Sequence, residues 1–251
     1  MENDIVKTNE PLIEAMFKAG AHYGYSRTKR HPTALGFLFG SKNRVEIFDL
    51  EKTKEKLLQA KSFVRSLGQA GRMILFVSSK VEARDPIKNG ALKIGAPYVA
   101  GRWIGGTITN FKVIRGRVDR LEELRAKKEK GELAKYTKKE RLLIDREIAT
   151  LERLFSGLIP LKNLPGALFV VDPKLEHTAA REALMAGIPV VALANSDCDF
   201  KDLTYPIPAN DAGLASIAFF TKEIVEAYEE GLKSRVAPAA EQMSAAGAVQ
   251  F

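Results

Sequence analysis

The chain has 251 residues, 45% of them apolar, so it is long enough to bury a substantial core in one large domain or in two. Its formal net charge of +8 attracts polyanions such as nucleic acid or an acidic membrane surface, although basic soluble enzymes are also common. The single cysteine, Cys198, excludes an internal disulfide framework, and the three scattered histidines make a zinc cluster or another metal cofactor unexpected.

Segments that direct export or span a membrane are not expected. Residues 1–8 lack the basic and apolar regions of a secretory signal. The longest apolar runs, 167–171 and 189–194, fall far short of the roughly 18 residues that a spanning helix needs. These features predict a cytoplasmic protein without membrane contact.

The first hundred residues predict alternating helices and strands. Residues 12–19 favour a short helix ended by Gly20, 45–48 a strand, and 50–66 a helix. The apolar run 73–78 then predicts a buried strand. A helix over 81–94, a break at 95–97 and a strand at 98–100 complete one βαβ unit.

A second βαβ unit is predicted after residue 166. Residues 167–171 form the strand, Asp172 can cap a helix that has Pro173 at its first position, and 190–194 form the next strand. Continuous apolar strands are typical of a mostly parallel sheet with helices on both faces. The sequence therefore predicts a Rossmann-like α/β body formed by residues 1–111 and 156–231.

Residues 112–155 differ from the rest of the chain in composition. They hold fourteen Lys or Arg and nine Asp or Glu, so most of the net charge lies here. Apolar residues recur at spacings of three and four on either side of Gly131, which predicts two helices packed as an antiparallel coiled-coil hairpin whose stripe buries against itself. A solvated arm without a partner is the alternative interpretation.

The C-terminal region predicts one more helix and a tail. Residues 214–230 favour the helix, and after Gly231 the chain turns to Ala, Ser, Pro and Gln without periodicity. We therefore expect residues 232–251 to be a mobile tail.

The predicted strand ends test whether the chain is an enzyme. Polar side chains follow the strands in the segments 78–80, 172–174 and 195–199, where an open parallel sheet binds small ligands. No G-x-G-x-x-G motif follows a strand, and no G-x-x-x-x-G-K-[ST] motif occurs. His177 favours a surface or packing role, and the Asp197, Cys198, Asp199 turn has no histidine or second thiol nearby as a further metal ligand. A sugar-phosphate-binding enzyme remains the alternative to a non-enzymatic protein.

The stretch 101–111, GRWIGGTITNF, holds the single tryptophan and a glycine pair that permits a tight bend before a helix. Trp103 can pack in the core or stack on a base, and its apolar neighbours Val99 and Ile104 favour packing.

This stretch closely resembles the signature of the bacterial small-subunit ribosomal protein two family. The resemblance extends to EAMFKAGAHYG at 14–24, NRVEIFDLEKT at 43–53, and the segment from VDPK at 171 to GIPVVA at 192, so it covers about residues 10 to 230. It implies a flavodoxin-like or Rossmann-like body with an inserted coiled-coil hairpin. It also implies a structural role in the small ribosomal subunit, without a cofactor.

The resemblance further implies partners. These are small-subunit rRNA and neighbouring ribosomal proteins, including the S-one-type mRNA-binding protein that the family helps to recruit, and no homo-oligomer is expected. The family usually has a tryptophan before Asn-Pro-Lys, where this chain has Arg30 and, in place of the basic residue, Thr33. Lysine and arginine displace counterions from phosphates, so we expect RNA contacts from cationic and neighbouring polar side chains: Arg27, Lys29, Arg30, Lys42, Arg44, Arg102, Trp103, Thr107, Asn110, Lys112, Arg115 and Arg117.

Overall fold

The computed structural model describes residues 11–245, so the signal-peptide expectation for residues 1–8 lies outside it. Its centre is a parallel sheet in the order β5-β4-β6-β7-β8. Counted along these strands alone, the order is 2-1-3-4-5, that of flavodoxin-like folds. The predicted Rossmann-like α/β class is therefore confirmed. The strands are β4 Ile74–Ser78, β5 Tyr98–Ala100, β6 Ala167–Val171, β7 Val190–Ala194 and β8 Tyr205–Pro208.

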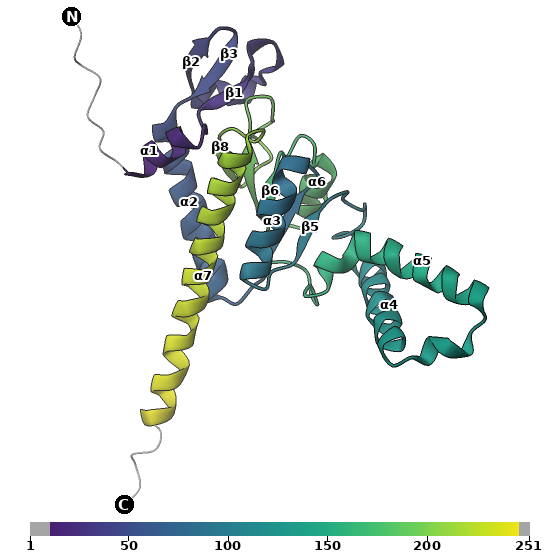
Figure 1. Cartoon of the computed structure of the whole chain (residues 1–251). Coiled ribbons are helices and arrows are strands. Elements are labelled where there is room, and N and C mark those ends of the chain that lie inside the picture. The colour runs from purple at the N-terminus through teal and green to yellow at the C-terminus, as the bar shows by residue number, and fades with distance from the viewer. Residues whose placement is uncertain (1–10, 246–251) are drawn as a thin grey trace, which may run out of the picture.

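Helices cover both faces of this sheet, as the apolar strands predict (Figure 1). Alternate side chains of β4 belong to opposite cores: Phe76 lies with helices α1, α2, α3 and α7, and Val77 lies with α6 and the base of the α4–α5 hairpin. The helices that pack near Phe76 are α1 Pro11–Lys18, α2 Leu50–Gln69, α3 Val81–Lys93 and α7 Leu214–Ala245, and α6 on the other face is His177–Met185. None of the described helices is long and apolar enough to cross a bilayer.

The charged segment forms two helices, α4 Phe111–Glu129 and α5 Lys138–Phe155, that project from the body (Figure 1). The turn between them contains the 3₁₀ turn η3 Glu132–Lys135, and a capping box of Thr137 and Glu140 starts α5. Ion pairs cross between the helices, so part of the charge is neutralised within the hairpin: Arg120–Glu147 at 3.3 Å, Arg125–Glu152 at 2.9 Å and Lys128–Asp145 at 2.7 Å.

The expectation that the hairpin stripe buries only against itself is wrong. Ile114 and Phe155 belong to the same core cluster as Val77 and Leu168 of the sheet. The 3₁₀ turn η4, Ser156–Leu158, holds the hairpin base against β5, where a Cβ on Gly157 would lie 2.2 Å from the Tyr98 carbonyl oxygen. One face of the sheet needs this cover, because α6 is only two to three turns long. The division into a body and a separate hairpin domain stays a prediction.

A small antiparallel sheet in the order β1-β3-β2 precedes the parallel one, and only β3 was expected. Two positive φ angles, at Asn43 and Arg44, make the tight β2–β3 turn. The backbone N–H groups of Tyr25 and His31 bind the side-chain and main-chain oxygens of Ser196, which tie this sheet to the carboxyl end of β7. The elements are β1 Tyr23–Ser26, the 3₁₀ turns η1 Arg27–Lys29 and η2 Pro32–Phe37, β2 Leu38–Lys42 and β3 Val45–Phe48.

The helix expected over residues 214–230 is longer than predicted, because α7 continues to Ala245, and the mobility of the tail from residue 232 stays a prediction. Leu232 packs against the apolar cluster beneath α2 and α7, and the following residues are rich in alanine, a strong helix former. Residues 246–251 of the expected tail lie outside the described residues.

Helices α2 and α7 cross at glycines. A Cβ on Gly231 would lie 2.2 Å from the Arg65 carbonyl oxygen, and one on Gly68 would lie 2.6 Å from the Tyr228 carbonyl oxygen. Neither obstacle is a flexible side chain, so a methyl group at either position forces the two helices apart.

Gly231→Ala is therefore expected to destabilise the protein by about 1–3 kcal/mol despite the better helix propensity of alanine. Gly116→Ala in α4 is the matched control, because its Cβ would meet nothing within 4 Å. That change should stabilise the protein by about 0.5–1 kcal/mol. Urea unfolding of both variants measures the difference, and equal effects at the two sites would contradict the close crossing.

Candidate nucleic-acid interface

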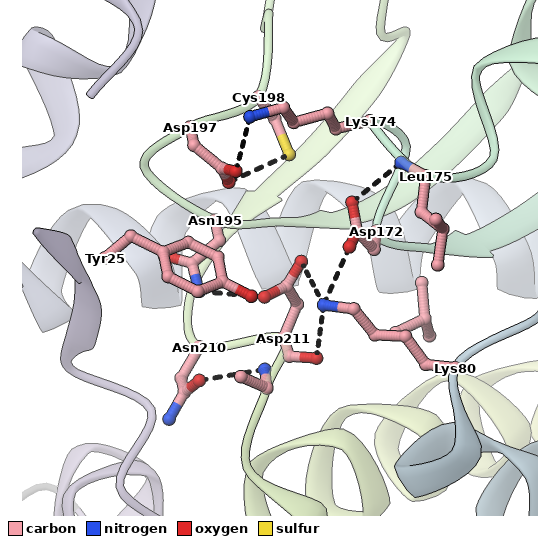
Figure 2. A network of polar contacts seen from close by, with 12 residues as sticks. Tyr25, Lys80, Asp172, Lys174, Leu175, Asn195, Asp197, Cys198, Asn210 and Asp211 are labelled. Carbon is pink, nitrogen blue, oxygen red and sulfur yellow. Dashed lines mark hydrogen bonds and ion pairs between the residues drawn. The ribbon is translucent and has the colours of Figure 1, made fainter. Parts of the chain in front are cut away.

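Part of the carboxyl end of the parallel sheet, where an enzyme of this class would bind its ligand, is occupied by a network of the chain's own polar side chains (Figure 2). The Lys80 ammonium, after β4, lies 2.8 Å from the Asp172 carboxylate and 3.1 Å from that of Asp211. It also donates to the main-chain carbonyl oxygen of Asp211 at 3.1 Å. The Asn195 side-chain amide donates to the second carboxylate oxygen of Asp211, Oδ1, at 2.8 Å. Lys80 thus takes the position between two carboxylates that a bound cation would occupy.

The network buries one ammonium between two carboxylates. Burial would by itself lower the pKa of Lys80, but the carboxylates of Asp211 and Asp172 raise it well above its usual value. Burial raises the pKa of Asp211 to about 6, an effect that Lys80 opposes and Asp172 increases. Because Lys80 is held charged between its partners, it is not available as a base or a nucleophile.

The side chains of the turn after β7 are likewise buried or bound to other residues of the protein. Burial, with nearby Asp211, strongly raises the pKa of the Cys198 thiol, which is therefore protonated at neutral pH and a poor nucleophile. Asp197 pairs with Lys174 at 2.8 Å, and Asp199 accepts from the Thr33 hydroxyl at 3.2 Å.

Two smaller expectations are tested beside this turn. His177 lies on the surface, as expected. Asp172 does not cap α6: its side chain accepts from the Leu175 N–H at 3.0 Å, and Glu176 is the residue that precedes the helix. The reason is a positive φ at Asp172, which inserts a separate turn before α6.

The glycine-rich loop between β5 and α4 does hold an anion, and that anion is a side chain of the same protein. Glu182 of α6, almost fully buried, accepts hydrogen bonds of 2.8–3.1 Å from N–H and O–H groups of the loop. The donors are Trp103 Nε1, the backbone N–H groups of Gly106, Ile108 and Thr109, and the Thr109 hydroxyl. The glycine pair lets the backbone turn these N–H groups toward one point.

The electrostatics of Glu182 follow from these bonds. Burial would raise its pKa, but the donors from Gly106, Trp103, Ile108 and Thr109 outweigh burial and lower it. The carboxylate is therefore charged at neutral pH and fixes the loop that leads into α4. Sequence reasoning missed Glu182, and the only available signal was the anion-binding character of the glycine loop opposite it.

Of the two roles considered for Trp103, the structure shows packing. The ring is 8% exposed and belongs to the core cluster under α6, and its N–H is bound to Glu182. Thr107 is also buried, with its hydroxyl bonded to the Ile104 carbonyl oxygen at 2.6 Å. Neither side chain presents a surface to a base. Asn110, which precedes α4, is exposed and makes no side-chain cap.

The expected cationic residues divide into two kinds. Arg30 pairs with the buried Glu46 at 3.0 Å, and Arg115 binds Asp119, Glu122 and the carbonyl oxygens of Ile159 and Leu161, so both are used within the fold. The others are exposed and make no ion pair with any described carboxylate: Arg27, Lys29, Lys42, Arg44, Arg102, Lys112 and Arg117.

The structure places these exposed cations in two groups. The antiparallel sheet brings Arg27 beside Arg44, because the Arg27 N–H binds the Arg44 carbonyl oxygen at 2.9 Å. Lys42 lies on the same β-turn, and Lys29 lies over the Tyr25 ring at 5.7 Å. Arg102, Lys112 and Arg117 form the second group, on the glycine loop and the first turns of α4.

Fold and site together define an α/β protein in which Lys80 lies between carboxylates at the carboxyl end of the sheet, and in which exposed cations without a described ion-pair partner lie on a turn and a helical arm. The family model described as ribosomal protein S2 matches residues 16–231. The chain belongs to the ribosomal protein S2 family, and it is a structural ribosomal component and not an enzyme. This family acts in the small ribosomal subunit.

Curated relatives agree with this assignment, and each is named small ribosomal subunit protein uS2. The one from Coprothermobacter proteolyticus is 40% identical over 223 residues, which are 89% of this chain and 83% of the relative. That from Chloroflexus aggregans is 37% identical over 223 residues, 89% of this chain and 94% of the relative. That from Mesoplasma florum is 40% identical over 229 residues, 91% of this chain and 86% of the relative.

Proposed function

We propose that this ribosomal component binds small-subunit rRNA through its unpaired cations and acts as one copy per subunit. The observation that carries the proposal is that some cations of the hairpin form ion pairs within the fold and others do not. Many hairpin cations are neutralised by hairpin acids, whereas Lys112 and Arg117, at the start of α4, are not. An exposed cation without an internal partner gains most from a phosphate, because it releases counterions and breaks no ion pair.

The geometry supports a fixed presentation of these charges. Glu182 holds the loop that carries Arg102, and the β2–β3 turn holds Lys42 and Arg44 beside Arg27. A prearranged set of cations loses little conformational entropy on binding. The hairpin then serves as a stiff coiled-coil arm of the RNA-binding surface.

Neutralising Lys112 or Arg117 with glutamine should weaken rRNA binding and flatten its salt dependence by about 0.7–0.9 per lost phosphate contact. Lys127→Gln is the matched control, because Lys127 lies on the same helix but pairs with Glu123 at 2.5 Å. Affinity for a small-subunit rRNA fragment at several salt concentrations measures both. If Lys127→Gln flattened the slope as much, net charge and not contact would explain the effect.

We also propose that the antiparallel sheet and α1 contact the S-one-type protein. Phe39 is 82% exposed on β2, and Phe17 and Tyr23 are more than half exposed nearby in the fold. Exposed aromatic side chains are enriched at protein–protein interfaces and costly to leave in water.

Phe39→Ser should therefore reduce co-purification of the S-one-type protein with small subunits and leave the melting temperature unchanged. Leu142→Ser, at an exposed position of the hairpin, is the control. Equal retention of the partner by Phe39→Ser and wild-type subunits would count against this surface.

A further inference from the structure

A groove crosses the N-terminal half of α3, the loop after β5 and the base of the hairpin. Two hollows form it, of about 180 and 350 Å³, and they share Arg84, Gly101 and Arg102. The first continues along Lys88 and Arg153 toward α5, and the second continues toward the start of α6. We infer that this groove binds the phosphate backbone of an RNA strand, a site that rests on the proposed rRNA binding and extends it to Arg84, Lys88 and Arg153.

The charge of the groove supports a polyanion. Arg84 and Lys88 are four residues apart on α3, so they project from the same side of the helix. Arg102 faces them from the β5 loop, and Arg153 comes from the last turns of α5. All four are exposed, and none makes an ion pair or a side-chain hydrogen bond with another described residue.

The acidic residues that line the groove already have partners within the fold. Glu152 pairs with Arg125 at 2.9 Å. Glu176, which is buried, accepts from the backbone N–H of Ser79 at 2.6 Å and from its hydroxyl. The cations therefore face no free carboxylate among the lining residues, and the groove attracts phosphate.

The shape favours a strand over a small molecule. The hollow of about 180 Å³ is below, and that of about 350 Å³ is in the lowest part of, the range of volumes that enclose small ligands, about 300–1,000 Å³. The two hollows are continuous through shared residues, and cations lie along both, so an extended chain of phosphates is matched along its length.

The test measures affinity for a small-subunit rRNA fragment against salt for the double variant Arg84→Gln/Arg153→Gln. We expect the slope of log K against log salt to flatten by about 1.4–1.8, the value for two lost phosphate contacts, with an unchanged melting temperature. The matched control is Lys127→Gln/Lys233→Gln, which removes the same charge from residues that pair with Glu123 and Glu229 outside the groove. Adenosine monophosphate, added as a competitor, should not displace the rRNA.

The outcomes separate this site from the proposed function. If the groove variant kept the wild-type slope while Lys112→Gln and Arg117→Gln flattened theirs, the groove inference would be wrong and rRNA binding would stand. If no cationic variant changed the slope, both would fail. Displacement of rRNA by adenosine monophosphate, lost in the groove variant, would show a nucleotide pocket and overturn the inference.

Discussion

Lys80→Met is expected to destabilise the folded protein by about 3–5 kcal/mol at neutral pH, because it leaves Asp172 and Asp211 buried without their counter-charge. The Asp211 carbonyl oxygen also loses its donor. Urea unfolding at neutral pH measures the loss. Lys174→Met is the control, because the Lys174 side chain is 56% exposed and its pair with Asp197 contributes less than about 1 kcal/mol.

The loss in Lys80→Met should depend on pH in a defined direction. The pKa of Asp211 is about 6 in the folded protein with Lys80 present, above its unfolded value of about 3.9, and loss of the ammonium raises it further. A raised folded pKa means that stability is fully present below the unfolded pKa and is lost as pH rises through the folded pKa.

The Lys80→Met variant should therefore be closest to wild type in mild acid and furthest from it above pH 7. Lys80→Met/Asp211→Asn should recover part of the loss by removing one buried charge. A penalty independent of pH would show that packing, and not the unpaired carboxylates, carries the effect.

Glu182→Ala should destabilise the protein by at least about 3 kcal/mol, since it orphans the buried donors of Trp103 and Ile108 together with those of Gly106 and Thr109. Amide hydrogen exchange at Ile108 and Thr109 should accelerate far more than at the Val170 amide in the central sheet, because the loop loses its acceptor first.

Two conservative variants show which part of this contact matters. Glu182→Gln keeps the shape and one acceptor, so its penalty should be smaller. Trp103→Phe removes a single donor, and its cost should be smaller than the roughly 3–5 kcal/mol expected for truncating the aromatic ring to alanine. An Ile108 amide that stays protected in Glu182→Ala would contradict the role given to Glu182.

Glu182 also makes the stability of the folded protein fall in acid. Its folded pKa is lowered, so its contribution is present above the unfolded pKa of about 4.3 and is lost as pH falls through the folded value. The stability of Glu182→Gln should therefore fall less in acid than that of the wild type. This sign is opposite to that expected for Asp211, so the two sites are separable by pH.

These two contacts show how the chain's own side chains take two positions at which other α/β proteins bind ligands. In the family's α/β body, the crevice at the strand ends is occupied by Lys80 and its carboxylates, and the β1 strand lies across it through Tyr25 and Ser196. The glycine loop that could cradle a phosphate holds Glu182 instead. We therefore assign the proposed rRNA binding to the exposed cations.

The sequence by itself determined the elements whose signal is local. The run 167–171 is apolar at every position, because both faces of β6 are buried, and the stripe from Ile114 to Leu124 has helical spacing, because α4 buries one side. The family signature lies in continuous segments such as 101–111, so it too was visible without the structure. The flanking glycines and prolines located the turns for the same reason.

Only the tertiary structure decided the features that depend on residues far apart in the chain. Glu182 reaches the loop across more than seventy residues, Lys80 reaches Asp211 across 131, and Ser196 holds β1 across 171. The hydrophobic periodicity of a sequence carries no information about such distant partners. Strands β1, β2 and β8 are only four or five residues long and partly exposed, so their hydrophobic pattern is weak, and they form because a neighbouring strand supplies their hydrogen bonds. Packing likewise placed the hairpin base on the sheet, since burial against another element outweighs local propensity.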